Sequence, residues 1–79
     1  MRDQIIEILE DINPDVDYDT CTTLIDDRHI ESLGMVSLVA ELEDEFDITI
    51  PAVEVVAENF NSVDAITALV ERLAEDDLD

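Results

Sequence analysis

The strongest constraint on the fold is the spacing of apolar residues between Glu31 and Asp47. Apolar side chains recur there every three or four positions, which is the period of an α-helix with one buried face. The sequence therefore predicts a central helix from about Ser32 to Phe46, with acids and no basic residue on its other face. The predicted buried stripe consists of Leu33, Val36, Val39, Leu42 and Phe46.

A second amphipathic pattern covers residues 1–12 and predicts a first helix. This helix should end at Asn13-Pro14, because proline disfavours a helical conformation in the residue before it. The apolar stripe of this helix is made of Ile5, Ile8, Leu9 and Ile12, with Ile6 beside it.

A last helix is predicted from about residue 62, with its end fraying into residues 75–79. Ser62 is a suitable N-cap, and Asp64 in the first turn suits the positive end of the helix dipole. The predicted buried positions are Val63, Ile66, Leu69, Val70 and Leu73.

Residues 48–58 separate the central helix from the last one. The alternation of Ile48 and Ile50 predicts a short extended segment that ends at Pro51, and proline is common in the first turn of a helix. Residues 52–58 then predict a short third helix, although their valines also fit a strand over residues 49–56. Residues 59–61 interrupt the pattern.

The connection over residues 13–31 is long for a compact domain, and such loops often carry function. Four apolar residues should hold it to the core, and Tyr18 should pack it onto the helices. Cys21 is predicted to be a half-buried structural residue, and His29 a surface residue. The four apolar residues are Val16, Leu24, Ile25 and Ile30.

Composition limits the possible functions. The 79 residues are predicted to form a single domain, 1–79, with 47% apolar residues and a formal charge of −20. Such a charge repels nucleic acid and anionic lipid, and attracts basic protein patches. One cysteine forms no internal disulfide, and neither a signal peptide nor a membrane span is recognisable. We expect a cytoplasmic monomer.

Ser32 is the first candidate functional residue. From the residues alone, a helix N-cap or a first-turn serine is the simpler interpretation. A phosphodiester on its hydroxyl would meet free backbone N–H groups and the positive helix end, worth about 0.3–1 kcal/mol. Serine is a weak nucleophile without a neighbouring base, and His29 has no third triad partner in the sequence. An outside enzyme would therefore have to activate Ser32.

The order of these features resembles the acyl and peptidyl carrier protein family. The shared features are a helix, a long loop, Ser-Leu opening a helix, an acidic Glu-Asp-Glu-Phe-Asp, Ile-Pro, a short helix and a last helix. The resemblance implies an all-α four-helix bundle of acyl-carrier type, with three main helices, one short helix and a long loop between the first two.

The resemblance also implies a function. Ser32, flanked by Glu31 and Leu33, would carry 4'-phosphopantetheine, added from coenzyme A by a phosphopantetheinyl transferase. The thiol of this arm would hold acyl or aminoacyl groups as thioesters for partner enzymes of fatty-acid, polyketide or related biosynthesis. The chain itself would not be an enzyme.

The chain departs from the family pattern at its site. Glu31 replaces the usual aspartate, and Gly34 and Ser37 replace acids of the fatty-acid members. Gly34 resembles a glycine of D-alanine carriers, which favours a specialised or D-alanyl-carrier-like member; local packing is an equal explanation for it. Partners with basic patches are expected to dock on the central helix. The expected contacts are Gly34, Met35, Ser37, Glu41, Asp44 and Glu45, with a loosely packed core methionine as the alternative for Met35.

Two other functions stay open. One is an acidic interaction module of the same fold that is never modified, because Glu31 spoils recognition. The other is a small calcium-binding helical protein, since four aspartates occupy positions 1, 3, 5 and 12 of an EF-hand-like loop. Thr20 replaces its glycine, so no specific metal site is predicted and only weak divalent binding is expected. The four aspartates are Asp15, Asp17, Asp19 and Asp26.

Overall fold

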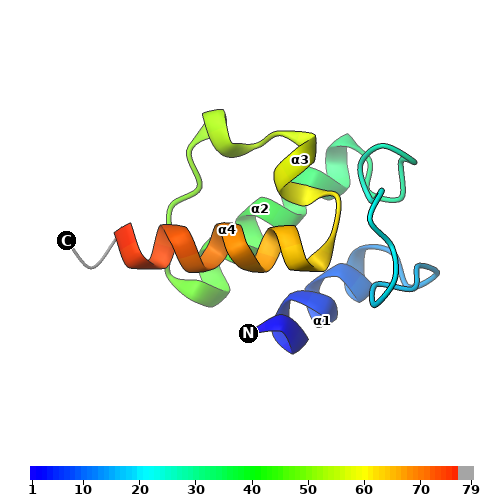
Figure 1. The fold of residues 1–79 in the computed structure, drawn as a ribbon, viewed down its shortest axis with the longest axis horizontal. Helices are drawn as coiled ribbons and strands as arrows, with labels where there is room; N and C mark the ends of the chain where they lie inside the picture. The colour runs from blue at the N-terminus through cyan, green and yellow to red at the C-terminus, as the bar shows by residue number, and fades with distance from the viewer. Residues whose placement is uncertain (77–79) are drawn as a thin grey trace.

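The computed structural model describes residues 1–76 and contains helices and turns, with no strand in that range (Figure 1). This confirms the predicted all-α fold with three main helices and one short one. The fraying predicted from residue 75 is wrong for residues 75–76, which are helical, and its remainder, residues 77–79, lies outside the described residues. The elements are α1 (Arg2–Ile12), α2 (Ser32–Phe46), the 3-10 helix η1 (Ala52–Glu54), α3 (Ala57–Phe60) and α4 (Val63–Asp76).

The helices pack around α4, which crosses the middle of the view in Figure 1. α1 packs against α2 and α4, and the short α3 packs against α4. The connection over residues 13–31 covers the end of the molecule at which α2 begins (Figure 1). The fold therefore brings the long loop and the start of α2 to the same end of a molecule with extents of 37 × 24 × 18 Å.

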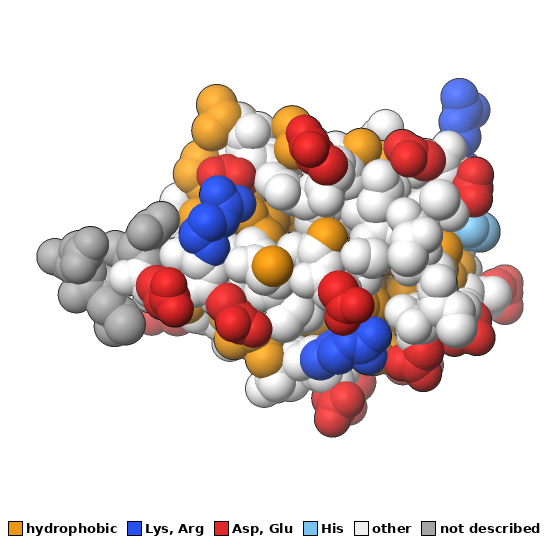
Figure 2. Space-filling model, viewed as in Figure 1, with side chains coloured by type: hydrophobic (Ala, Val, Ile, Leu, Met, Phe, Trp, Pro, Cys, Tyr) orange, Lys and Arg blue, Asp and Glu red, His pale blue; other side chains and the backbone are white. Residues whose placement is uncertain are grey.

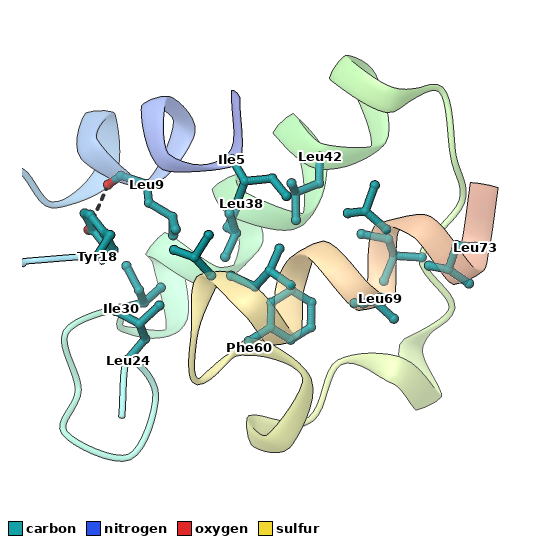
Figure 3. Close-up of a cluster of buried hydrophobic side chains, with 14 of the residues drawn as sticks. Ile5, Leu9, Tyr18, Leu24, Ile30, Leu38, Leu42, Phe60, Leu69 and Leu73 are labelled. Carbon is teal, nitrogen blue, oxygen red and sulfur yellow. Dashed lines mark hydrogen bonds between the residues drawn. The ribbon is translucent and has the colours of Figure 1, made fainter. Parts of the chain in front are cut away.

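The core is aliphatic, with one large aromatic side chain, Phe60, fully buried among the helices (Figure 3). The predicted stripes of α1 and α4 are confirmed: Ile5 and Leu9 are buried in α1, and all five predicted positions of α4 are buried. The Ser62 hydroxyl accepts a hydrogen bond from the Ala65 N–H at 3.0 Å, so the predicted N-cap is also confirmed.

The predicted buried stripe of α2 is wrong in its first half. Leu33 is 84% exposed and Val36 is 68% exposed, whereas Leu38 and Leu42 are fully buried. The predicted stripe is spaced by three residues from Leu33 to Leu42, and three residues turn an α-helix by about 300°. Each step therefore falls about 60° short of a full turn, and three steps place Leu33 on the side of the helix opposite Leu42. Leu42 faces the core, so Leu33 faces solvent.

The predicted third helix over residues 52–58 is also placed incorrectly. η1 occupies residues 52–54, and α3 begins only at Ala57 and includes Phe60. Val53 within η1 is 82% exposed, Val55 and Val56 after it are exposed too, and the alternative strand is not formed. Burial of Phe60 fixes this segment, because a large aromatic side chain gains more from burial than the valines do.

The long connection is held to the core as predicted. Leu24 and Ile30 are buried, while Val16 and Ile25 are half-buried against the core. Tyr18 is 5% exposed, and its hydroxyl lies 3.0 Å from the Leu9 carbonyl oxygen (Figure 3). The same hydroxyl lies 2.6 Å from the Asn13 carbonyl oxygen. The single hydroxyl hydrogen is shared between two carbonyls at the C-terminal end of α1.

Tyr18 should make the stability of the fold depend on alkaline pH. Burial raises the pKa of the Tyr18 phenol, and the charge of Glu10 acts in the same direction. The folded-state pKa is raised, so the protonated Tyr18 hydroxyl contributes fully to the free energy of unfolding below about pH 10, the ordinary phenol pKa. This contribution is lost as pH rises through the higher folded-state pKa. Tyr18→Phe should cost about 1 kcal/mol at pH 7.

Urea unfolding of both proteins between pH 7 and pH 11 measures this effect. The difference in free energy of unfolding between native protein and Tyr18→Phe should shrink above pH 10. A difference that stays constant across the range would contradict the role given to the hydroxyl.

Candidate functional site

The candidate site lies where the long connection enters α2. Glu31 is the N-cap, with an extended backbone at φ −90° and ψ 176°, and its carbonyl accepts the Met35 N–H at 2.8 Å. Ser32 is the first helical residue and is exposed. The expected helix N-terminal position of this serine is therefore confirmed, as a first-turn residue.

The first turn of α2 offers unpaired donors to an anion. The N–H groups of Ser32, Leu33 and Gly34 precede the first intrahelical hydrogen bond and have no helix carbonyl to bond. No acid lies in this first turn, and the Glu31 side chain makes no capping hydrogen bond. A phosphodiester on the Ser32 hydroxyl fits this position, since both the free N–H groups and the helix dipole favour negative charge.

The other two serines are less suited to modification. The Ser62 hydroxyl is engaged as the cap of α4, and the residue is half-buried. Ser37 is exposed, but it lies in the second turn of α2. Backbone N–H groups in that turn are already bonded to carbonyls within the helix. Among the 76 described residues, no hydrogen bond involves the Ser32 hydroxyl.

An open hollow of ≈ 550 Å³ adjoins Ser32. Its walls combine polar and apolar groups in similar measure, with one guanidinium and one carboxylate among them. Such a hollow leaves space beside the hydroxyl for a bulky substituent. The lining residues are Ile25, Arg28, Ile30, Glu31, Ser32, Leu33 and Met35.

Asn61 fixes the loop wall of this hollow. Its side-chain oxygen accepts the N–H groups of Ile25 at 2.9 Å and Asp26 at 3.1 Å, and its carbonyl accepts the Leu24 N–H at 2.9 Å. Its amide also donates to the Asp26 carboxylate at 3.2 Å. In the sequence Asn61 is recognisable only as one of the residues that interrupt the helical pattern, because nothing local points to a partner 36 residues away.

Gly34 has a packing role. A Cβ built on it would lie 3.1 Å from Ile12 Cγ2 and 3.3 Å from Ile30 Cγ2, so the missing side chain allows α1 and the loop to approach α2 closely. Met35 is half-buried against the core and also lines the hollow beside Ser32. The structure therefore supports the packing explanation for both residues, and their contact with a partner stays a prediction.

The acids of α2 divide into two groups. Glu41, Asp44 and Glu45 are exposed, as a docking surface requires, and so is Ser37. Glu43, by contrast, is half-buried, and its carboxylate accepts the Ile50 N–H at 2.8 Å. This bond supports the turn after α2, where Asp47 takes a left-handed conformation at φ 52°.

A second exposed feature is an apolar surface between α2 and the segment 52–56, here called the valine surface. Figure 2 shows exposed hydrophobic side chains at the edge of the molecule where the segment between α2 and α3 lies. A hollow of ≈ 380 Å³ lies in this surface, lined by Met35, Val36, Val39, Ala40, Glu43 and Val55. Its exposed members are Val36 and Val55, whereas the exposed Val53 and Val56 line a different hollow, beside Arg72 of α4.

The aspartates of the EF-hand-like loop do not converge. Within residues 1–76, no group of three or more acidic, histidine or cysteine side chains is arranged to hold a metal ion. Asp19 instead pairs with Arg2 at 3.2 Å, and Asp26 accepts the Asn61 amide. Asp15 and Asp17 are exposed. The structure gives the calcium-binding alternative no support.

Cys21 and His29 have structural surroundings. Cys21 is half-buried, as predicted, with its Sγ 3.8 Å from Thr23 Oγ1. His29 is half-buried too, so its predicted surface position is only partly correct, and its carbonyl accepts the Asn13 side-chain amide at 2.9 Å. In the described part of the chain, no helix is long and apolar enough to cross a membrane.

The structure is a small helical bundle with an exposed serine at the positive end of its second helix. The family described as phosphopantetheine attachment site matches residues 3–70, and the chain belongs to this family of carrier proteins. Its cofactor is accordingly 4'-phosphopantetheine, covalently attached.

Two carrier proteins have sequences similar to that of this chain. The D-alanyl carrier protein of Lactococcus lactis subsp. cremoris (strain MG1363) is 30% identical over 78 residues, covering 96% of this chain and 99% of its own. Aminoacyl carrier protein 2 of Bradyrhizobium diazoefficiens is 41% identical over 44 residues, covering 56% of this chain and 49% of its own. No solved structure matches the chain at a comparable level of significance.

Glu31 should be a suboptimal cap. An aspartate at the N-cap can accept the N–H of the second or third helical residue, whereas the longer Glu31 side chain makes no such bond. Glu31→Asp should raise the free energy of unfolding by about 1 kcal/mol. Urea unfolding measures the change, with Glu31→Gln as the control that keeps the length and removes the charge. A Glu31→Asp variant no more stable than native protein would contradict this account of the cap.

Proposed function

We propose that Ser32 carries the 4'-phosphopantetheine arm. The observation that supports this most directly is the exposed hydroxyl at the start of α2, unengaged by any described residue and adjacent to free backbone donors. The arm supplies a thiol that holds the cargo as a thioester. In this proposal α2 presents the hydroxyl to a transferase, Leu33 and Glu31 flank it, and the hollow beside Ser32 leaves room for the attached group.

The proposed cargo is aminoacyl, with D-alanine as the first candidate. The names of both relatives support an amino acid over a fatty acyl group. Gly34 and Ser37 support it as well, since fatty-acid members carry acids at these positions. The core adds a physical argument: ten side chains, Phe60 the largest, are almost completely inaccessible. A small charged aminoacyl group needs no apolar cavity in such a core.

The proposed partners are a phosphopantetheinyl transferase and enzymes that load and use the aminoacyl group. The valine surface adjoins Ser32 through Leu33 and Val36, and acids extend along the rest of α2. Partners with an apolar centre and a basic rim would match this arrangement. The chain itself, as a single 1–79 domain, contributes presentation and no catalysis in this proposal.

Modification at Ser32 is tested by intact mass. After incubation with coenzyme A and a broad-specificity transferase, the native chain should gain the mass of one phosphopantetheine group. Ser32→Ala should gain nothing, and the matched control Ser37→Ala should behave as native, since both serines are exposed on α2. Full modification of Ser32→Ala would overturn the assignment, and an unmodified native chain would favour the interaction-module alternative.

The valine surface is tested with a charge. Val36→Glu places a carboxylate in the centre of the surface, where docking would have to desolvate it. An ATP-dependent enzyme that loads D-alanine should show a KM for this variant raised roughly tenfold, with kcat changed less. Gln4→Glu adds the same charge to an exposed residue of α1, away from this surface, and serves as the control. Equal KM values for the two variants would exclude docking on this surface.

A further inference from the structure

We propose that Arg28 binds the phosphodiester of the arm and thereby sets the position of the attached group. This inference rests on the proposed attachment at Ser32. It concerns a residue in the loop before α2, four positions ahead of the serine, that lines the same hollow. It assigns to the loop a positioning role that is separate from the helix N-terminus.

Arg28 differs from the other two arginines of the chain in its surroundings. Arg2 pairs with Asp19 and Asp64, each at 3.2 Å, and Arg72 pairs with Glu54 at 2.9 Å. The structure gives Arg28 no ion pair with any residue of the described range, although the chain has 23 acids. In Figure 2 a basic side chain projects from the end that carries the long connection, whereas the other basic groups in this view lie against carboxylates.

The nearest acids along the chain are engaged elsewhere. The Asp27 carboxylate accepts the Thr23 hydroxyl at 2.6 Å, and the Asp26 carboxylate accepts the Asn61 amide at 3.2 Å. Each bond holds an acid in a contact of its own within the loop. The guanidinium of Arg28 is therefore left as a cation available to an added anion.

The backbone of Arg28 is held in a specific conformation. Its φ is 60°, in the left-handed region that residues other than glycine rarely occupy. Its N–H donates to the Ile25 carbonyl at 3.0 Å. The Ile30 N–H donates to the Leu24 carbonyl at 3.0 Å immediately after it. Buried Leu24 and Ile30 anchor this turn, so the direction in which Arg28 leaves the loop is fixed by the core.

The charge balance of the hollow favours the assignment. Its charged lining residues are Arg28 and Glu31, so the carboxylate and the guanidinium offset each other. An added phosphodiester gives the hollow a second negative charge, on a chain that already carries −20. A guanidinium is planar, is always protonated and binds phosphate oxygens through paired N–H groups. Arg28 would also reduce the repulsion between the phosphodiester and Glu31.

The test compares modified and unmodified forms of the same variants. Native chain, Arg28→Gln and Arg28→Lys are modified to completion, as judged by intact mass, and the Tm of each form is measured. The difference in Tm between modified and unmodified forms isolates the effect of the arm. Arg72→Gln is the matched control, because it removes an equal charge from the C-terminal half of α4.

Loss of the phosphodiester contact should lower this Tm difference by about 2–5 °C in Arg28→Gln. Arg28→Lys should retain part of the native value, and Arg72→Gln should retain all of it. In 1 M salt, where the screening length is about 3 Å, native chain and Arg28→Gln should converge. The ³¹P resonance of the phosphodiester should shift in Arg28→Gln and stay in place in Arg72→Gln.

Equal effects of Arg28→Gln and Arg72→Gln on the Tm difference would overturn the inference, as would an unmoved ³¹P resonance in Arg28→Gln. A native chain that gains no mass would instead overturn the attachment itself. Intact mass therefore separates a failure of the proposed function from a failure of the role given to Arg28.

Discussion

The position of Ser32 depends on how the connection over residues 13–31 is attached to the bundle. Leu24 and Ile30 bury its middle and its end, and Asn61 binds three consecutive N–H groups of its central turn, from Leu24 to Asp26. Together these part-buried and exposed hydrogen bonds attach the loop to Asn61, shortly before the start of α4. The entry to α2, and the hydroxyl that it presents, follows from these contacts.

α2 combines a buried face with an exposed apolar one. Leu38 and Leu42 face the core, whereas Leu33 and Val36 lie in solvent close to the candidate serine. Apolar side chains left exposed together often mark a binding surface. Val55, in the segment before α3, is exposed and lines the same hollow as Val36, so this segment adds to a surface that α2 begins.

Some charged side chains of this acidic chain hold the fold together, and one arginine does not. Glu43 and Glu54 support the turn after α2 and the contact with Arg72, so these two acids stabilise the fold. Arg2 ties the long loop and α4 to α1, and its hydrogen bonds to Asp19 and then Asp64 raise its pKa. Arg28, which has no such partner in the described chain, is left at the end where function is proposed.

The sequence by itself determined the three main helices, because periodicity, a proline and a serine cap are local signals. The bounds of α2, the end of α1 before Pro14 and the cap at Ser62 were all predictable. The sequence also indicated Ser32, through an ordered set of features. Only the tertiary structure decided which side of α2 is buried, since its apolar residues surround more than one face. The contacts of Asn61 and the surroundings of Arg28 likewise depend on segments far apart in the chain, which no local pattern specifies.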